Sequence, residues 1–389
     1  MSHCNTILNQ ILKIIPRHQF ESLAKKHHVG RKFRTSNRWS QFTAITLAQL
    51  SGRMSLRDIA DNMKAQAHRM YHLGVALISK SNLSRINNDK PYHMYEELFG
   101  LLLPRCQKMT KGHGFRFKNK LYSLDASTID LCLNLFPWAR FRKNKGAVKL
   151  HVGLDHSGYL PEFISITDGK TADITAGRCI DFPKNSIVVC DRAYNDFSWF
   201  NTLRLKEINF VTRLKSNAKY KVIKSQNVNS KHSIISDEII TFTGIATAKK
   251  CPHKLRLITY IDPETKREFR FLTNHLKLSA NTIAKIYKSR WQIELFFKWI
   301  KQNLKIKKFI GTSKNAVMTQ IWIAMCVYLI ISYIKHSSKI SKSMQQILRL
   351  LQLNLFERRE LIPMLLDIPI KIPIQNPNQQ LLFQKLTGQ

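Results

Sequence analysis

Residues 121–128 read Leu-Tyr-Ser-Leu-Asp-Ala-Ser-Thr, an apolar run that carries one carboxylate at Asp125. Its first five residues predict a β-strand, because the run is short, apolar and rich in aliphatic side chains. Two further strands are predicted over 147–154 and 160–166, with Gly158 at the turn between them. Three strands at this spacing indicate an antiparallel meander.

The chain then changes its pattern. Residues 187–191 read Ile-Val-Val-Cys-Asp and predict a fourth strand, and the spacing of Phe197, Phe200 and Leu203 predicts a helix. A further strand is expected over 210–213. Three hairpin-spaced strands followed by strand, helix and strand predict an α/β fold. Its core is a mixed sheet with helices, of the ribonuclease H-like type.

Two of these strands end in or contain a carboxylate, at Asp125 and Asp191. A charged side chain in a buried strand is costly unless it is paired or binds a metal. Either acid alone could be satisfied by backbone groups or by an arginine. Asp130, Asp155 and Asp173 compete with them as metal ligands, and Asp155, just after the second strand, is the strongest of these rivals.

A third acid lies on a helix with an unusual polar face. At about 100° per residue, Arg290, Glu294 and Lys301 fall about 60°, 20° and 40° from Tyr287, so one helix would carry all four on one side. An adjoining apolar stripe would dock this helix on the core. Its members are Ile286, Ile293, Phe297, Ile300 and Leu304. Glu294 could instead pair with Lys298 at the surface. Trp291 and Trp299 lie off the polar face and are expected in the core.

The charge of the chain indicates a polyanionic partner. It contains 63 Lys and Arg against 25 Asp and Glu, a formal net charge of +38, which favours nucleic acid. Residues 121–210 are near neutral, with eleven basic and ten acidic residues, between two strongly basic arms. Residues 305–308 carry three lysines after the Glu294 helix, and these are expected to lie along the DNA and contact its backbone.

The organisation predicted along the chain has five parts. These are a helical DNA-binding domain over 1–105, a linker over 106–119, a ribonuclease H-like core over 120–215 and 276–335, a β-strand insertion over 216–275, and a helical C-terminal tail over 336–389. In the first part, Ser55 and Ser81 are predicted to cap short helices of a helix-turn-helix-type module.

Several classes of protein are disfavoured. The seven cysteines form no Cys-x-x-Cys pair and are expected to be reduced, as in a cytoplasmic protein. The apolar run 321–334 is too short to span a bilayer and predicts a buried helix. No phosphate-binding loop motif is present, so a nucleotide cofactor is not expected.

The string Tyr287-x2-Arg290-x3-Glu294-x6-Lys301 resembles the signature of a large group of bacterial insertion-sequence transposases that use an Asp-Asp-Glu triad. Four further stretches resemble other blocks of that group: 124–128, 149–155, 189–194 and 321–325. The block after the second Asp often has Gly where this chain has Ala193. A backbone with positive φ at that point would be strained by alanine.

The resemblance implies a function and a site. Asp125, Asp191 and Glu294 would be the catalytic residues and would bind two Mg²⁺ or Mn²⁺ ions. Tyr287, Arg290 and Lys301 would contact the phosphates of the transposon end. The group typically acts as a homodimer on double-stranded DNA, cuts both strands at inverted-repeat ends, often through a hairpin, and joins the 3′-hydroxyls to target DNA.

Further DNA contacts are expected from residues near the acids. Arg192 and Tyr194 directly follow the second Asp, and Lys298 lies one turn after Glu294. The protein is expected in the bacterial cytoplasm, associated with the nucleoid. Two alternatives remain open. One is a ribonuclease H-like nuclease that cuts without strand transfer, and the other is a non-catalytic DNA-binding protein derived from a transposase.

Overall fold

The computed structural model describes residues 5–143, 145–228 and 233–368. Its centre is a mixed sheet whose first strands are β1 (Leu121–Leu131), β3 (Lys145–Asp155) and β4 (Leu160–Asp168), with the short β2 (Arg140–Arg142) at the edge. These pair antiparallel. The strands β5 (Ile187–Cys190) and β6 (Asn209–Arg213) then add parallel to β1. The order β4-β3-β1-β5-β6 confirms the predicted ribonuclease H-like core.

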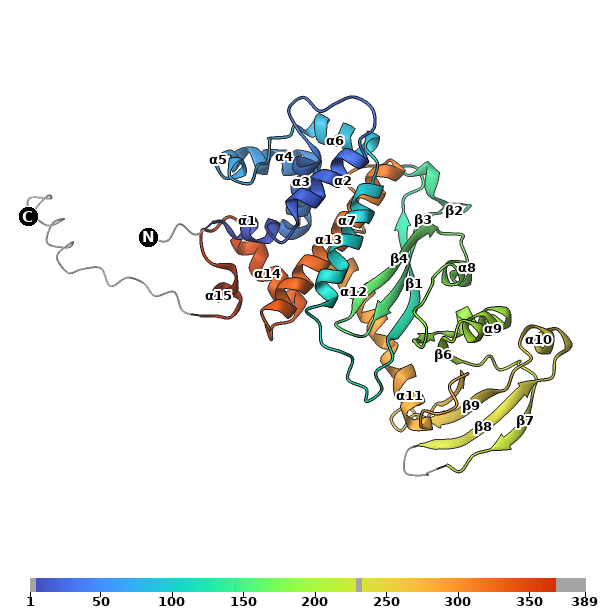
Figure 1. Cartoon of the computed structure of the whole chain (residues 1–389). Coiled ribbons are helices and arrows are strands. Elements are labelled where there is room, and N and C mark those ends of the chain that lie inside the picture. Colours follow the sequence, from blue (N-terminus) through green and yellow to red (C-terminus); the bar gives the residue numbers. More distant parts are fainter. Residues whose placement is uncertain (1–4, 144, 229–232, 369–389) are drawn as a thin grey trace, which may run out of the picture.

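The residues of the predicted insertion extend this sheet. Within the described chain, β10 (Glu268–Thr273) pairs antiparallel with β6, and β9 (Leu255–Ile261), β8 (Ile234–Phe242) and β7 (Tyr220–Ser225) follow outward. The short α10 (Ile245–Lys250) connects β8 to β9. Figure 1 shows these strands as a separate lobe in yellow, at the end of the molecule away from the N-terminal helices. The segment was predicted as a β-strand insertion between the sheet and the Glu294 helix, and its strands continue the same sheet through the pairing of β10 with β6.

Helices cover both faces of the central strands. The helices α11 (Ala280–Ser289) and α12 (Trp291–Asn303) pack on one face, α11 against β5 and β6 and α12 against β1. The helices α8 (Asp173–Arg178) and α9 (Phe197–Leu205) pack on the other face, where Phe200 stacks on Phe210 with ring centroids 4.3 Å apart. A polar residue of β1 therefore faces either α12 or α8.

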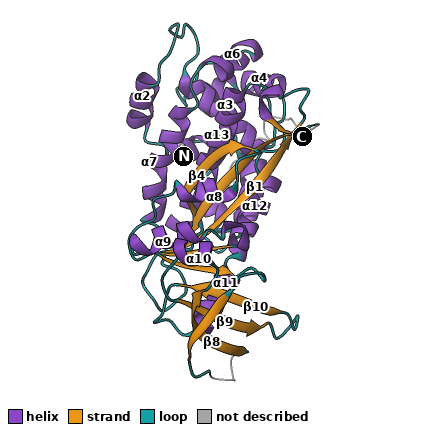
Figure 2. Ribbon diagram, turned by 90° about the vertical axis from the view of Figure 1, so that its right-hand side faces the viewer, coloured by secondary structure: helices purple, strands orange, loops and turns teal. Residues whose placement is uncertain are grey.

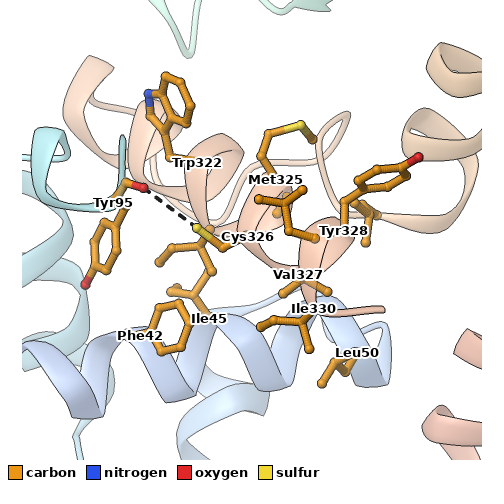
Figure 3. Close-up of a cluster of buried hydrophobic side chains, with 14 of the residues drawn as sticks. Phe42, Ile45, Leu50, Tyr95, Trp322, Met325, Cys326, Val327, Tyr328 and Ile330 are labelled. Atoms are coloured by element: carbon orange, nitrogen blue, oxygen red, sulfur yellow. Dashed lines mark hydrogen bonds between the residues drawn. The ribbon is translucent and has the colours of Figure 1, made fainter. Parts of the chain in front are cut away.

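The N-terminal helices share one hydrophobic core with the C-terminal half of the chain (Figure 2). They are α1 (Ile7–Leu12), α2 (Arg17–Lys26), α3 (Arg38–Ser51), α4 (Leu56–Ala65), α5 (Ala67–Tyr71), α6 (Lys80–Asp89) and α7 (His93–Gln107). At the centre of this core is α13 (Lys314–Ser337), which packs against α3 and α7. Figure 3 shows Cys326 of α13 between Tyr95 and the α3 side chains Phe42 and Ile45. These helices are therefore firmly packed on the core.

The burial of α13 agrees with its predicted role as a core helix. It is the one described helix that is long and apolar enough to cross a membrane, and 94% of its most apolar 18-residue window is buried inside the protein. The six cysteines within the described residues are free thiols, as predicted.

The two predicted N-terminal helix caps, at Ser55 and Ser81, have different outcomes. The Ser55 side chain accepts a hydrogen bond from Asp58 N at 3.0 Å and caps α4, as predicted. The cap predicted at Ser81 was wrong, since α6 begins two residues earlier and its cap is Ser79. After α13 the chain forms α14 (Met344–Asn354) and α15 (Leu361–Leu365). The Pro, Asn and Gln-rich part of the tail predicted to be loosely ordered lies largely outside the described residues.

Candidate active site

Sheet register places Asp125 and Asp191 next to each other. β1 and β5 pair in parallel up to Leu124 and Cys190, and the next residue on each strand is the aspartate. The Asp191 Oδ1 accepts a hydrogen bond from Ala193 N at 2.7 Å, which fixes the turn Arg192–Tyr194 that follows β5. The φ angle of Ala193 is not positive, so alanine is compatible with this turn.

The third acid arrives from the helical face. Glu294 lies in the first turn of α12, and α12 packs on β1. The single helix predicted over Tyr287 to Lys301 is in fact two helices, α11 and α12, which meet at Arg290. The amide of Arg290 bonds to Tyr287 O and that of Ile293 to Arg290 O, both three residues back, so the helix tightens there. The apolar stripe from Ile286 to Leu304 is buried as predicted.

Arg290 connects two of the acids. Its Nη1 lies 3.2 Å from Asp125 Oδ2, and its Nη2 donates to Glu294 Oε1. The side chain of Arg290 is 16% exposed, while those of Asp125 and Glu294 are 23% and 34% exposed. Acids from β1 and α12 therefore converge on one guanidinium on the face of the sheet that α12 covers.

The pKa of Asp125 reflects its burial and its charged neighbours. Burial raises the pKa of its carboxyl to about 6. The amide of Ala126 and the Arg290 guanidinium oppose the rise, whereas the negative charges of Asp191 and Glu294 add to it. All three carboxylates thus lie within electrostatic reach of one another.

The carboxylates are nevertheless not arranged as a finished metal site. Among the described residues, no group of three or more His, Cys, Asp and Glu side chains is close enough to hold a metal ion. A cation does already occupy the space between Asp125 and Glu294, namely the Arg290 guanidinium. Carboxylate oxygens are the ligands that Mg²⁺ and Mn²⁺ prefer. The donor set therefore fits a divalent cation once Arg290 turns aside.

The rival acids lie elsewhere. Asp155 is opposite Tyr122, at the other end of the β1–β3 ladder from the pairs that follow Asp125, and is 3.9 Å from Lys120. Asp173 is paired with Lys149 at 3.0 Å on the α8 face. Asp130 is exposed near the end of β1. None of the three joins Asp125 and Arg290.

The basic and phenolic partners on α11 and α12 take different positions. Tyr287 packs on Phe271 with ring centroids 4.6 Å apart, and the Arg290 guanidinium lies 6.0 Å from its ring. Lys301 donates to Thr128 O at 2.8 Å and so reaches β1, as Arg290 does. The predicted common side of Arg290 and Lys301 thus faces the sheet that carries Asp125.

Of the three remaining predicted DNA contacts, two are accessible. Arg192 and Lys298 are exposed beside the acids. Tyr194 is only 1% exposed and packs on Trp199, with ring centroids 6.3 Å apart. Its ring is held beneath α8, so the expectation that it touches DNA was wrong for this structure.

A cavity of about 930 Å³ opens beside Arg290. Its walls are largely aromatic and basic. They include Tyr260, Phe269, Phe271, Tyr287, Lys285, Lys288, Arg290 and Trp291. Trp291 was expected in the core but is 57% exposed, whereas Trp299 packs on Tyr328 as expected. The helical spacing located Trp291 correctly off the polar face, but could not show that this side borders the inserted strands.

Comparison with known proteins gives matches over both halves of the chain. Residues 116–330 match the family described as a transposase DDE domain. Residues 3–76 match a domain of unknown function. The first match spans the sheet, its inserted strands and α12, and so covers all three carboxylates.

Three curated relatives cover about two thirds of the chain or more. A putative transposase from Sinorhizobium fredii is 31% identical over 72% of this chain and 78% of its own length. A probable transposase for insertion sequence element IS5377 from Geobacillus stearothermophilus is 29% identical over 68% and 70%. A putative transposase for insertion sequence element IS4SA from Synechocystis is 26% identical over 65% and 71%.

Proposed function

As a member of the transposase DDE-domain family, this chain is a DNA transposase, and we propose that it cuts and joins DNA at the ends of an insertion sequence. In this proposal it binds the inverted-repeat ends, cleaves them by phosphoryl transfer and joins the freed 3′-hydroxyls to target DNA. The observation that carries it is the convergence of three acids from separate segments: Arg290 bridges Asp125 and Glu294, and Asp191 lies beside Asp125 where the pairing of β1 and β5 ends.

We assign the three acids as ligands of two Mg²⁺ or Mn²⁺ ions. When bound, these ions would lower the charge on the scissile phosphate and help to activate the attacking oxygen. The proposal is supported by the donor set and by the cationic guanidinium that bridges Asp125 and Glu294. If the ions supply this chemistry, the other side chains of the site have to bind the DNA and position its end at the acids.

Arg290 has two roles in this scheme. Without DNA it neutralises the neighbouring negative charges of Asp125 and Glu294. With DNA, the same guanidinium turns to a phosphate oxygen and frees the acids. Its Nε is buried and has no hydrogen-bond partner among the described residues, so a donor remains for that phosphate.

The surrounding side chains place the DNA end. Arg192 and Lys298 are exposed on either side of the acids and would bind phosphates. Lys301, held by Thr128 O, keeps α12 on β1 and adds positive charge along the strand path. Tyr287 and Trp291 would line the cavity that receives the end of the strand. A homodimer would hold two such ends together.

A strand-transfer assay tests the proposal. The substrate is a duplex with a pre-cleaved inverted-repeat end and a free 3′-hydroxyl, incubated with target plasmid and Mg²⁺. The proposal expects joined products from the wild type and none from Asp191→Asn, while both proteins bind the end. A parallel reaction uses the uncleaved end. Cleavage of that end without joining of the pre-cleaved one would instead identify a nuclease, and end binding without either reaction would identify a non-catalytic DNA-binding protein.

A further inference from the structure

Four arginines surround a second cavity, far along the chain from the acids. It has a volume of about 640 Å³ and lies where the N-terminal helices meet the segment after α14. Arg53 comes from the loop between α3 and α4, Arg69 from α5, and Arg358 and Arg359 from the segment before α15. Glu357 is the one acid in the described lining. We call this the four-arginine pocket.

The guanidinium groups retain unused donors. Arg53 is paired with Asp58 at 2.8 Å, and Arg359 with Glu357 at 3.5 Å. The Nε atoms of Arg53, Arg69 and Arg359 are nevertheless buried and have no hydrogen-bond partner among the described residues. Four guanidinium groups against one carboxylate also leave the lining with a net positive charge, and guanidinium groups match the oxygens of a phosphate. The pocket is therefore suited to a phosphate.

The pocket is built in advance of any ligand. The segment from Leu355 to Leu361 is tied to α1 by backbone hydrogen bonds of Ile7 and Leu8, and the Gln10 side chain bonds to Arg359 O at 2.7 Å. Arg69 Nη1 donates to Phe356 O at 2.8 Å. Figure 1 shows α14 and the α15 segment beside α1. Arg358 and Arg359 thus start from a fixed backbone, which lowers the cost of ordering them on binding.

The four-arginine pocket lies next to the end of the active-site helix. Lys305 follows α12, and its backbone N bonds to Gln49 of α3 at 2.6 Å. A Cβ at Gly52 would lie 3.8 Å from Lys305 Nζ and 3.9 Å from Gln352 Nε2, and Gln352 lines the pocket. From Glu294 to the end of α12 the helix rises about 14 Å, roughly four base pairs of duplex. Lys298 and Lys301 of α12 and Lys305 after it therefore lie along the chain between Glu294 and the pocket.

We propose that the four-arginine pocket binds a backbone phosphate of the transposon-end duplex, several base pairs from the cut, and that the segment 355–361 is part of the end-binding surface. This inference rests on the proposed function, because it needs the DNA end to lie at Asp125, Asp191 and Glu294. Several lysines on and after α12, together with the four arginines, suit an extended polyanion better than a small free anion.

Charge reversal at matched positions tests the proposal. Arg358 lines the pocket, whereas Arg349 is exposed on α14 and is not part of the described lining. Arg358→Glu and Arg349→Glu are each made in the full chain carrying Asp125→Ala, which prevents cleavage. Binding of a labelled inverted-repeat duplex is followed by fluorescence anisotropy across a salt series, and thermal unfolding confirms that both variants fold.

The expected result separates the two positions. Arg358→Glu weakens binding roughly tenfold to a hundredfold near 0.1 M salt and reduces the slope of log affinity against log salt by about 1. Arg349→Glu changes affinity by less than about threefold, because an unbound surface charge is screened. Hydroxyl-radical footprinting should show lost protection at one place on the duplex only for Arg358→Glu.

Other results overturn the proposal. Equal losses at both positions would show a general effect of net charge. Unchanged end binding with a shift in sedimentation for Arg358→Glu would make the pocket a contact between protein chains. If the parent protein binds the inverted repeat no better than a scrambled duplex, end recognition itself fails, and the proposed function falls together with the pocket.

Discussion

Two arginine–carboxylate clusters on the same sheet differ in how completely they are satisfied. Arg256 of β9 pairs with Asp237 of β8 through two bonds, at 2.8 and 2.6 Å, and both side chains are about 5% exposed or less. Arg290 instead divides its bonds between Asp125 and Glu294, keeps a free Nε within the described chain and is more exposed.

The contrast indicates that the Arg256–Asp237 pair is structural, whereas the Arg290 cluster can exchange its ion-pair partners for ligands. The Arg256 guanidinium also donates to Leu278 O and so holds the inserted strands to the loop before α11. The Arg256–Asp237 pair is buried and its charges are matched, so it offers no site for a ligand. Around Arg290, two acids share one cation, and the pKa of Asp125 is raised by burial and by the negative charges of Asp191 and Glu294. In such an arrangement the carboxylates can bind metal ions in place of Arg290, and Arg290 can bind a phosphate in place of the carboxylates.

The largest expected effect comes from removing one acid of the Arg290 cluster. We expect Asp125→Asn to lower the single-turnover cleavage rate by roughly 10⁴-fold, because the residues of such a site act as a unit. Its affinity for the DNA end should change only a few-fold. The control is Asp237→Asn, which should lose stability but cleave at the wild-type rate while folded. Equal loss of activity in both variants would contradict a distinct catalytic role for Asp125.

The next effect concerns the buried pair. We expect Arg256→Ala to lower the free energy of unfolding by about 3–5 kcal/mol, because Asp237 is left as an unpaired buried charge. Urea denaturation measures this change. The matched control is Arg270→Ala on β10, whose guanidinium lies near Tyr220 and is less buried; about 1 kcal/mol is expected there. Similar values for the two variants would refute the contrast.

Removing Arg290 should affect binding more than folding. We expect Arg290→Ala to weaken binding of the DNA end roughly tenfold and to reduce its salt dependence, since one charge-assisted phosphate contact is lost. The free energy of unfolding should change by about 1 kcal/mol or less, because the cluster is partly exposed. Arg290→Lys should restore only part of the affinity, since lysine cannot bind two oxygens in a fork. A large loss of stability with normal binding would reverse this assignment.

The last effect is a pH dependence of stability. An unfolded aspartate has a pKa of about 3.9, whereas that of Asp125 is raised to about 6 in the folded protein. Between these values the folded state holds a proton that the unfolded chain has lost. The contribution of Asp125 to the free energy of unfolding therefore falls as pH rises from about 4 to 6. Urea titrations should show this fall in the wild type and a smaller one in Asp125→Asn; parallel curves would count against it.

The sequence was most informative where local periodicity decides the structure. Apolar strand patterns located β1, β3, β4, β5 and β6, and the aspartate at the end of each of two runs identified Asp125 and Asp191. The stripe from Ile286 to Leu304 was predicted because a helix repeats its buried face. Such features depend on neighbours within a few residues.

Features that depend on distant contacts were not predictable in the same way. The helix tightens at Arg290, where the side chain bonds to Asp125, 165 positions away in the chain. The exposure of Trp291 and the burial of Tyr194 depend on which elements pack beside them. The four-arginine pocket joins residues from opposite ends of the chain, and no spacing rule connects Arg69 with Arg358.

Binding of Mn²⁺ tests the central claim most directly. The wild type, Asp125→Asn, Glu294→Gln and the control Asp237→Asn are each titrated with Mn²⁺ in complex with the end duplex, and the free ion is followed by electron paramagnetic resonance. We predict two ions per active site for the wild type and the control, and loss of tight binding for Asp125→Asn and Glu294→Gln. Wild-type Mn²⁺ binding by these last two variants would contradict the claim that the acids gather around metal ions.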